Sequence, residues 1–202
     1  QSFGTNLQYH HLFHQKIPGE LIKLDLKRDG QKMSLQIPLQ AVIGQHRLIA
    51  PIKYNQKPQY LIYGGFVITV LTTNYIQDAF GGLLDTTPAN LRSFEKESKT
   101  KEKKEIVIIA SKLNDKVNDG FESEEIEDQA IAKVDYQVQG SAETFSENLV
   151  DLEHLVLLLS REDITNYAFH LENGNLIAMP KFNQLTHKRI LSTYDVEHDR
   201  SL

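Results

Sequence analysis

The stretch YLIYGGFVITVLT, residues 60–72, is an apolar run that Gly64-Gly65 interrupts and that then resumes. Its aromatic and β-branched residues predict a pair of short strands around the glycines. Two small residues ahead of a strand leave consecutive backbone N–H groups uncovered, and such a nest can receive a carboxylate. The structural alternative is a glycine bend that lets two elements pack closely and binds nothing. The spacing alone does not separate these two interpretations.

A second wall for such a site is predicted further along the chain. Leucines and a valine recur at helical spacing through residues 149–159, and Asn148 or Ser146 is a suitable cap for that helix. A carboxylate nest, a free strand edge and a facing helix together make up a PDZ domain. The predicted site comprises Tyr63, Gly64, Gly65 and Phe66 around the carboxylate, Val67 and Ile68 on the free edge of strand 66–71, and Leu152, Leu155 and Val156 in the side-chain pocket.

Composition excludes several classes of protein. The chain has 202 residues, of which 40% are hydrophobic, so it can bury the core of one large or two small domains. Its net charge of −5 gives no basic footprint for nucleic acid. The absence of cysteine excludes disulfides, thiolate zinc sites and a cysteine nucleophile. No apolar run approaches the roughly 20 residues that span a bilayer.

The first 40 residues predict a small unit. Leu7, Leu12 and Phe13 suggest a short helix that ends before Pro18-Gly19. Two alternating runs then flank Asp29-Gly30, which is a strong hairpin signal. Such a unit is too small to bury its own core, so we expect it to pack against other residues.

The remaining residues predict short strands and few helices. Strands are expected at 105–113 and 130–138, followed by a hairpin that turns at Glu172-Asn173-Gly174. Asn183 is expected to cap a last helix, which would point Leu185, Ile190, Leu191 and Tyr194 inward. The mixed-charge run near 95–104 reads as a solvated, mobile insert. The predicted fold is α+β and mainly β: a partly open β-barrel or sandwich capped by two helices.

No catalytic, metal or cofactor motif in the sequence is complete. His10 and His14 are spaced for one helix face, but His11 stands where a zincin has glutamate. Asp115, Asp119 and Gly120 fit part of a calcium loop, which lacks its final glutamate. No serine lies in a G-x-S-x-G elbow, and no glycine-rich phosphate loop is present. We therefore expect no cofactor and no enzymatic activity in this chain itself.

Several motifs together resemble a known family. They are PQYLIYGGFVITVLTTNYI (58–76), EIVIIASKLNDKVNDGF (105–121), HLVLLL (154–159), FHLENGNLIAM (169–179) and KRILSTYDVEHDRSL (188–202). In order and rough spacing they resemble the last PDZ-type domain of Deg/HtrA-like serine proteases, the subgroup of plant Deg proteases and their bacterial relatives. Residues 11–39, HLFHQKIPGELIKLDLKRDGQKMSLQIPL, resemble the end of the preceding PDZ domain. Where the family has Val-Asn-Gly, this chain has Val134-Asp135-Tyr136-Gln137, followed by extra residues.

The resemblance implies an organisation and a set of partners. Residues 1–43 would be the remnant of a first PDZ domain and 44–202 a second, PDZ-like domain. The trypsin-type domain with its catalytic triad would lie before Gln1, in a parent endopeptidase that is extracytoplasmic if bacterial. Expected partners are peptides or unfolded-protein C-termini, the chain's own protease domain and other copies of the chain. The alternative is an oligomerisation module whose groove is filled by its own chain.

Overall fold

The computed structural model describes residues 17, 19–39, 46–52, 54–82 and 86–201. The helix predicted around Leu7, Leu12 and Phe13, and the pair His10 and His14, lie outside these residues. The chain divides into two compact units, Gln1–Ile43 and Gly44–Leu202, which are described separately.

The first unit contains the predicted hairpin. Strand β1 (Leu21–Arg28) pairs antiparallel with β2 (Gln31–Pro38). Asp29 and Gly30 form the turn with φ values of 51° and 82°, the positive values that a two-residue turn between twisted strands needs. The alternation places three cross-strand pairs on one face: Ile22 with Ile37, Leu24 with Leu35 and Leu26 with Met33. One face of this hairpin is therefore apolar.

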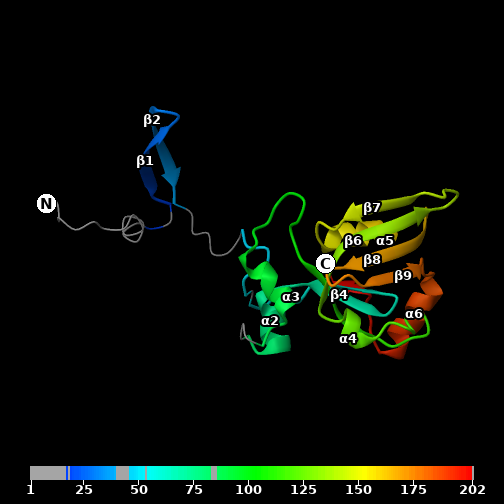
Figure 1. The fold of residues 1–202 in the computed structure, drawn as a ribbon. Helices are drawn as coiled ribbons and strands as arrows, with labels where there is room; N and C mark the ends of the chain where they lie inside the picture. The colour runs from blue at the N-terminus through cyan, green and yellow to red at the C-terminus, as the bar shows by residue number, and fades with distance from the viewer. Residues whose placement is uncertain (1–16, 18, 40–45, 53, 83–85, 202) are drawn as a thin grey trace. The chain divides into compact units, whose positions relative to one another are not determined.

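The second unit is built on one antiparallel sheet (Figure 1). Its strands are β3 (Tyr60–Tyr63), β4 (Phe66–Val70), β5 (Val107–Lys112), β6 (Gln129–Val138), β7 (Thr144–Asn148), β8 (Ile164–Leu171), β9 (Leu176–Pro180) and β10 (Arg200–Ser201). The strand order is β10-β3-β4-β5-β6-β8-β9, and β7 also pairs with β6. β6 begins beside β5 and continues between β7 and β8. The sheet is open rather than a closed barrel, in agreement with the predicted fold class.

Helices cover the sheet in more pieces than the sequence predicts. They are α2 (Thr73–Phe80), α3 (Ala89–Arg92), η1 (Ser93–Lys96), α4 (Ser123–Ile126), α5 (Leu152–Ser160) and α6 (Gln184–Thr193). Figure 1 shows α2 and α3 on one side of the domain and α5 behind the strands on the other. The two expected helices are α5 and α6. α2 lies at the start of residues 74–94, whose sequence is weakly helical and loop-like, and Thr72 starts it by accepting a hydrogen bond from the Tyr75 N–H at 3.1 Å.

The predicted start of α5 is wrong, whereas that of α6 is confirmed. α5 begins at Leu152 because Asp151, rather than Asn148 or Ser146, accepts from the His154 N–H at 2.8 Å. Residues 144–148 instead form β7. Asn183 caps α6 by accepting from the Thr186 N–H at 2.8 Å, but Leu185 in its first turn is 78% exposed.

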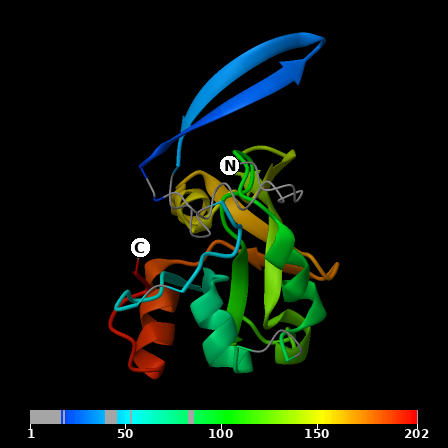
Figure 2. The same cartoon turned by 90° about the vertical axis from the view of Figure 1, so that its left-hand side faces the viewer.

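Two groups of buried residues form the core of the second unit. The larger lies between strands β3–β9 and helices α4 and α5, with Ile68, Val134, Leu155 and Phe169 fully buried. The smaller, beside α2 and α3, consists of Leu48, Ile49, Leu71, Leu91, Phe94, Ile106, Ile108 and Ala130. Figure 2 shows α2 and α6 from the side. All members of both clusters come from residues 48–179.

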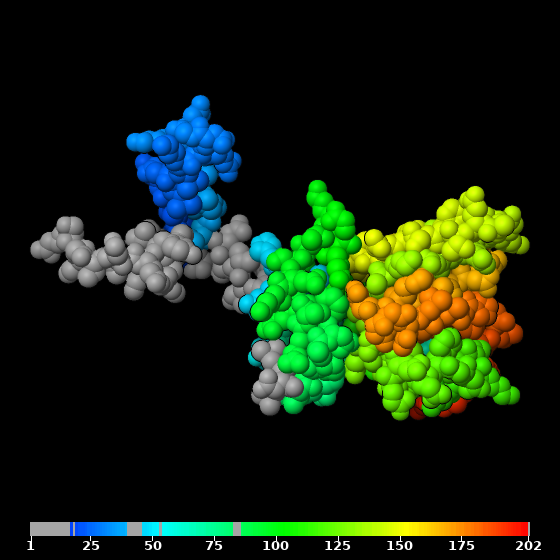
Figure 3. All heavy atoms as spheres, in the orientation of Figure 1, coloured from blue at the N-terminus to red at the C-terminus, as the bar shows by residue number. Residues whose placement is uncertain are grey.

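The charged insert near 95–104 is mostly exposed, as predicted, and contacts the domain at several points. Lys103 lies 3.8 Å from carboxylates of Glu97 and Glu172, and its ammonium stands over the Phe94 ring. Lys104 pairs with Asp151 at 3.1 Å. Figure 3 shows the chain around residue 100 projecting from the surface in green. Such exposed pairs each stabilise a fold by about 1 kcal/mol or less.

In the part of the chain that the structure describes, every helix is too short or too polar to cross a lipid bilayer.

Candidate functional site

The glycine pair forms a tight turn that is covered by the protein itself. Gly64 and Gly65 join β3 to β4 with φ values of 59° and 84°, and Tyr63 pairs with Phe66 across them. Both glycines are buried. A Cβ on Gly64 would lie 2.4 Å from Cε2 of Phe182, and one on Gly65 would lie 2.3 Å from Nδ2 of Asn118. The glycines are therefore needed for close packing, which is the structural alternative raised by the sequence.

Asn118 holds this turn in place. Its side chain is fully buried, and its Nδ2 donates to the Gly64 carbonyl at 3.0 Å and to the Leu113 carbonyl at 2.8 Å. Its Oδ1 accepts from the Asp115 N–H at 3.0 Å. The Leu113 N–H donates in turn to the Gly65 carbonyl at 2.7 Å. The loop 113–118 thereby satisfies both glycine carbonyls, which would be costly to bury unpaired.

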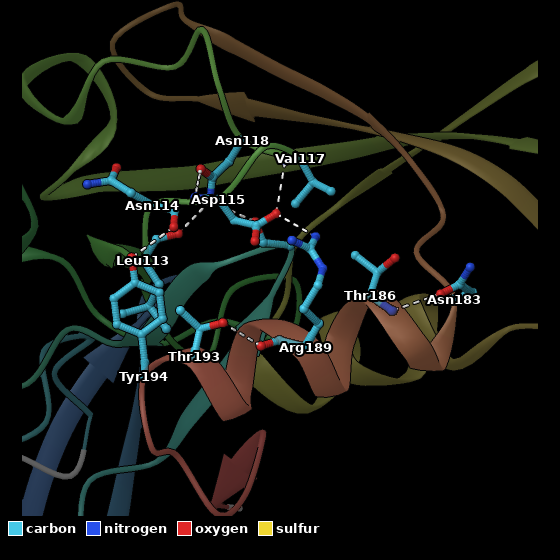
Figure 4. A network of polar contacts seen from close by, with 11 residues as sticks. Leu113, Asn114, Asp115, Val117, Asn118, Asn183, Thr186, Arg189, Thr193 and Tyr194 are labelled. Atoms are coloured by element: carbon cyan, nitrogen blue, oxygen red, sulfur yellow. Dashed lines mark hydrogen bonds and ion pairs between the residues drawn. The ribbon is translucent and has the colours of Figure 1, made fainter.

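Helix α6 anchors that loop from the outside (Figure 4). Arg189 lies 2.7 Å from Oδ1 of Asp115, and the Tyr194 hydroxyl donates to the Asn114 carbonyl at 2.8 Å. Burial raises the pKa of Asp115, but the hydrogen bonds from Arg189 and Val117 and the Arg189 charge lower it more, so the pKa lies below its usual range. Asp115, one residue of the partial calcium loop, is thus engaged by a cation of the protein.

The free edge predicted for Val67 and Ile68 is wrong. β4 pairs with β3 on one side, where Val67 faces Ile62, and with β5 on the other, where it faces Ser111. In the strand order β10-β3-β4-β5, β3 rather than β4 lies toward the edge of the sheet. Ile68 points into the core and is fully buried.

The other predicted site residues divide between the core and a cavity. Leu152 and Leu155 are fully buried in the large core cluster, and Phe66 is buried beside the ring of Phe121. Tyr63 and Val156 also belong to that cluster, but both reach a cavity of about 540 Å³. Carboxylate binding at Tyr63, Gly64, Gly65 and Phe66 stays a prediction that requires Phe182 and Asn118 to move aside.

This cavity lies among β3, α5 and α6. Its lining includes Leu61 and Tyr63 from β3, Val156 and Leu159 from α5, and His187 and Leu191 from α6. The Tyr63 hydroxyl accepts a long bond of 3.4 Å from the Phe182 N–H. Desolvation raises the pKa of Tyr63 to about 12, so it is protonated at neutral pH. The cavity therefore has an apolar wall and a polar rim on α6.

The outer edge of β3 carries a short strand from the end of the chain. In β10, Arg200 pairs with Leu61 and Ser201 with Tyr60, and the Ile62 N–H donates to the Asp199 carbonyl at 2.7 Å. The Tyr60 hydroxyl donates to the His198 carbonyl at 3.2 Å. Residues 197–200 also line the cavity. The sequence did not predict this strand, because two residues carry no detectable periodicity.

A second polar cluster crosses β6, β7 and β8. Ser146 and His170 both bond to the carboxylate of Asp135, and Lys133 lies 3.3 Å from it. The carboxylate stands between the hydroxyl and the imidazole, whereas an activated nucleophile needs the imidazole beside the hydroxyl. This cluster links three strands.

The open antiparallel sheet with helices packed against it is consistent with the α+β fold of a PDZ domain, and comparison with known protein families agrees. The sequence profile of the PDZ domain matches residues 49–202. The chain therefore belongs to the PDZ domain family, whose members are modules for peptide binding and protein interaction. No curated protein matches the chain.

Proposed function

We propose that the chain is the non-catalytic PDZ region of a Deg/HtrA-like serine endopeptidase and that it recognises extended segments of substrate proteins. The observation that carries the peptide-binding part is the edge of β3, where an extended segment is added antiparallel beside an apolar cavity. Main-chain bonds to a sheet edge supply affinity that is independent of sequence, and an adjacent pocket supplies selectivity.

The outward-facing backbone groups of β3 would hold the ligand. The backbone N–H and carbonyl groups of Tyr60 and Ile62 point toward this edge, because alternate residues of a strand bond to the same neighbour. The hydrogen bond from the Ile62 N–H to the Asp199 carbonyl shows this direction. A ligand side chain would enter the cavity between Tyr63 and Val156. The proposed groove therefore lies along β3 instead of along β4, and it keeps Tyr63 and Val156 from the predicted site.

The link to a Deg/HtrA-like parent is supported by the motifs shared along the chain. Residues 1–43 would then be the end of a preceding PDZ domain. The exposed apolar face of the β1–β2 hairpin supports this assignment, because a lone hairpin is marginally stable and needs cover. The parent's coding sequence before Gln1 tests it: a trypsin-like domain with a Gly-x-Ser-Gly-Gly segment is expected, and its absence would refute the assignment.

Peptide recognition is tested by fluorescence anisotropy with a library of labelled peptides. Each peptide is used with a free and with an amidated C-terminus, on the whole chain. We expect binding to extended peptides that a Val156→Lys substitution abolishes, because a lysine would fill and charge the cavity. Val138→Lys, on a partly buried valine at the end of β6 and away from the cavity, is the control. Failure of the whole library on every form of the chain would refute the proposal.

The second candidate function is an oligomerisation module with a groove filled by its own chain. The buried glycine turn and the occupied edge of β3 favour it. Size-exclusion chromatography with light scattering separates the candidates. A strict monomer that captures peptides supports recognition, and a stable oligomer that binds none supports assembly.

A further inference from the structure

The segment Glu197–Ser201 occupies the edge of β3 in the way a bound ligand would. We propose that it is a displaceable self-ligand, and that the site prefers extended segments with an acidic residue at the position of Asp199, selected by His187. This inference rests on the proposed peptide-binding function and adds to it the chemical class of ligand and the means of occlusion.

Asp199 is the residue at which backbone and side-chain recognition meet. Its carbonyl accepts from the Ile62 N–H at 2.7 Å, so it is in register with the sheet. Its Oδ2 lies 3.1 Å from Nε2 of His187 on α6. The backbone of a residue at this position is therefore bound by β3, and its side-chain carboxylate reaches His187 on α6. An amide side chain at the same position would lack the negative charge that attracts the imidazole.

The groups around this carboxylate are mainly basic. Lys188 follows His187 on the wall of the cavity, and Arg200 places Nε 3.2 Å from Oδ1 of Asp199. His198 and the carboxylate of Glu197 line the same cavity from the segment itself. Tyr63 from β3 adds a neutral ring 6.3 Å from the His187 ring. The fixed part of the site, on α6 and β3, thus presents basic and neutral groups to the ligand.

The segment is held by few contacts, which makes displacement feasible. β10 has two residues, and Arg200 is exposed. The contact between Asp199 and His187 is partly exposed, and an exposed contact of this kind contributes about 1 kcal/mol or less. The pair between Asp199 and Arg200 lies within the segment and does not bind it to the domain. A longer peptide would add further main-chain bonds along the edge of β3.

The groove also continues past the segment. Ser201 borders another cavity, of about 770 Å³, whose lining includes Gln59, Thr69, Tyr75 and Asp78. The residue paired with Ser201 is Tyr60, at the start of β3. A ligand in the register of Glu197–Ser201 would therefore carry its next residues toward this second cavity.

Binding of synthetic peptides to the whole chain tests the inference. The probe is VEHDRSL, the sequence of residues 196–202, acetylated and amidated at its ends, and the comparison peptide is VEHNRSL. We expect the chain to bind the acidic peptide about fivefold more tightly, the effect of one partly exposed ion pair. His187→Gln keeps an N–H donor but not the imidazole, and should reduce this preference to less than twofold.

The self-ligand is tested by weakening it within the chain. Asp199→Asn should raise the affinity for VEHDRSL about fivefold, because the competing segment is bound less often. Glu162→Gln removes an exposed carboxylate that lies outside both the segment and the cavity, and should leave the affinity unchanged. Circular dichroism checks that each variant is folded, and hydrogen exchange at Ile62 reports release of the segment independently of peptide binding.

The outcomes separate this inference from the function on which it rests. If no form of the chain, Asp199→Asn included, binds any peptide, the proposed function itself fails. If peptides bind but Asp and Asn versions bind equally, the acidic preference is refuted. If Asp199→Asn changes neither affinity nor exchange at Ile62, the segment is a permanent strand and the self-ligand is refuted.

Discussion

Gly65 is the residue on which the β3–β4 turn depends most. Its φ of 84° is strained for any residue with a side chain, and its surroundings leave no room for one. An added Cβ would approach the Leu113 carbonyl to 2.5 Å as well as the Asn118 amide. Glycine is therefore required at this position for two independent physical reasons.

Gly65→Ala is expected to lower the free energy of unfolding by about 2–4 kcal/mol, from backbone strain together with the clash. Urea denaturation followed by circular dichroism measures the change. Gly140→Ala is the matched control, because Gly140 has a φ of 80° and open space around its Cβ position. The control should lose about 1 kcal/mol from strain alone. Equal losses in both variants would contradict the role of the Asn118 contact.

Asn118→Ala is expected to cost about 2–3 kcal/mol, because the Gly64 and Leu113 carbonyls would lose a buried donor. Asn118→Asp should cost more, since a carboxylate would then face these carbonyls. The control is Asn173→Ala on the surface, where the amide also donates to a carbonyl, that of Glu125. Thermal and urea unfolding measure all three variants. A loss at Asn118 no larger than at Asn173 would show that the loop does not depend on this side chain.

At the scale of single residues, the sequence predicted position better than role. It placed Gly64-Gly65 at a break between strands, and it placed Asn183 at a helix cap. Both signals are local, and turn and cap chemistry is readable from a few neighbours. The sequence did not predict that Asn118 and Phe182 contact the turn, because they lie 54 and 118 residues beyond Gly64 along the chain. Such contacts depend on the tertiary fold and leave no pattern in one sequence.

At the scale of elements, the strand that lies toward the edge of the sheet is β3, whereas the sequence predicts that it is β4. The sequence identified both strands but assigned the open edge to β4, which β3 and β5 enclose. Pairing partners are not encoded in the alternation of one strand. β7 was missed because its residues are largely exposed and polar, so the alternation of apolar residues along this strand is weak.

Strands β6, β7 and β8 are linked through Asp135, which makes their stability depend on pH. Burial raises the pKa of Asp135, but hydrogen bonds from Ser146, His170 and Lys133 lower it more, so the folded-state pKa is depressed. A depressed carboxyl pKa stabilises the fold above the unfolded value of about 3.9, and this contribution is lost as the pH falls through the folded pKa.

Asp135→Asn is therefore expected to be less stable than the wild type by about 1 kcal/mol at pH 7, as for a partly exposed charge network. The difference should narrow as the pH falls below about 4. Urea titrations between pH 3 and pH 7 measure it. Ser146→Ala, which removes a neutral partner, should show a smaller and flatter difference. A gap between Asp135→Asn and wild type that stays constant with pH would contradict the linkage.

At the scale of the whole molecule, the two units differ in how they are stabilised. The hairpin in Gln1–Ile43 exposes its apolar face, with Leu26 at 40% and Ile37 at 44%. A two-stranded hairpin of this kind is marginal in water. The second unit has both buried clusters and a sheet of eight strands. The stability of the chain should therefore come from residues 44–202.

Removal of residues 1–43 is expected to leave the free energy of unfolding of the remaining domain within about 0.5 kcal/mol of that of the whole chain. The physical reason is that every residue of both core clusters lies at or after Leu48. Removal of residues 1–59 is the control: it deletes Leu48 and Ile49, and each buried aliphatic side chain lost costs about 2–5 kcal/mol. Urea denaturation of the three chains decides the matter. A loss above about 1 kcal/mol in the chain that begins at residue 44 would show that the hairpin unit stabilises the PDZ domain directly.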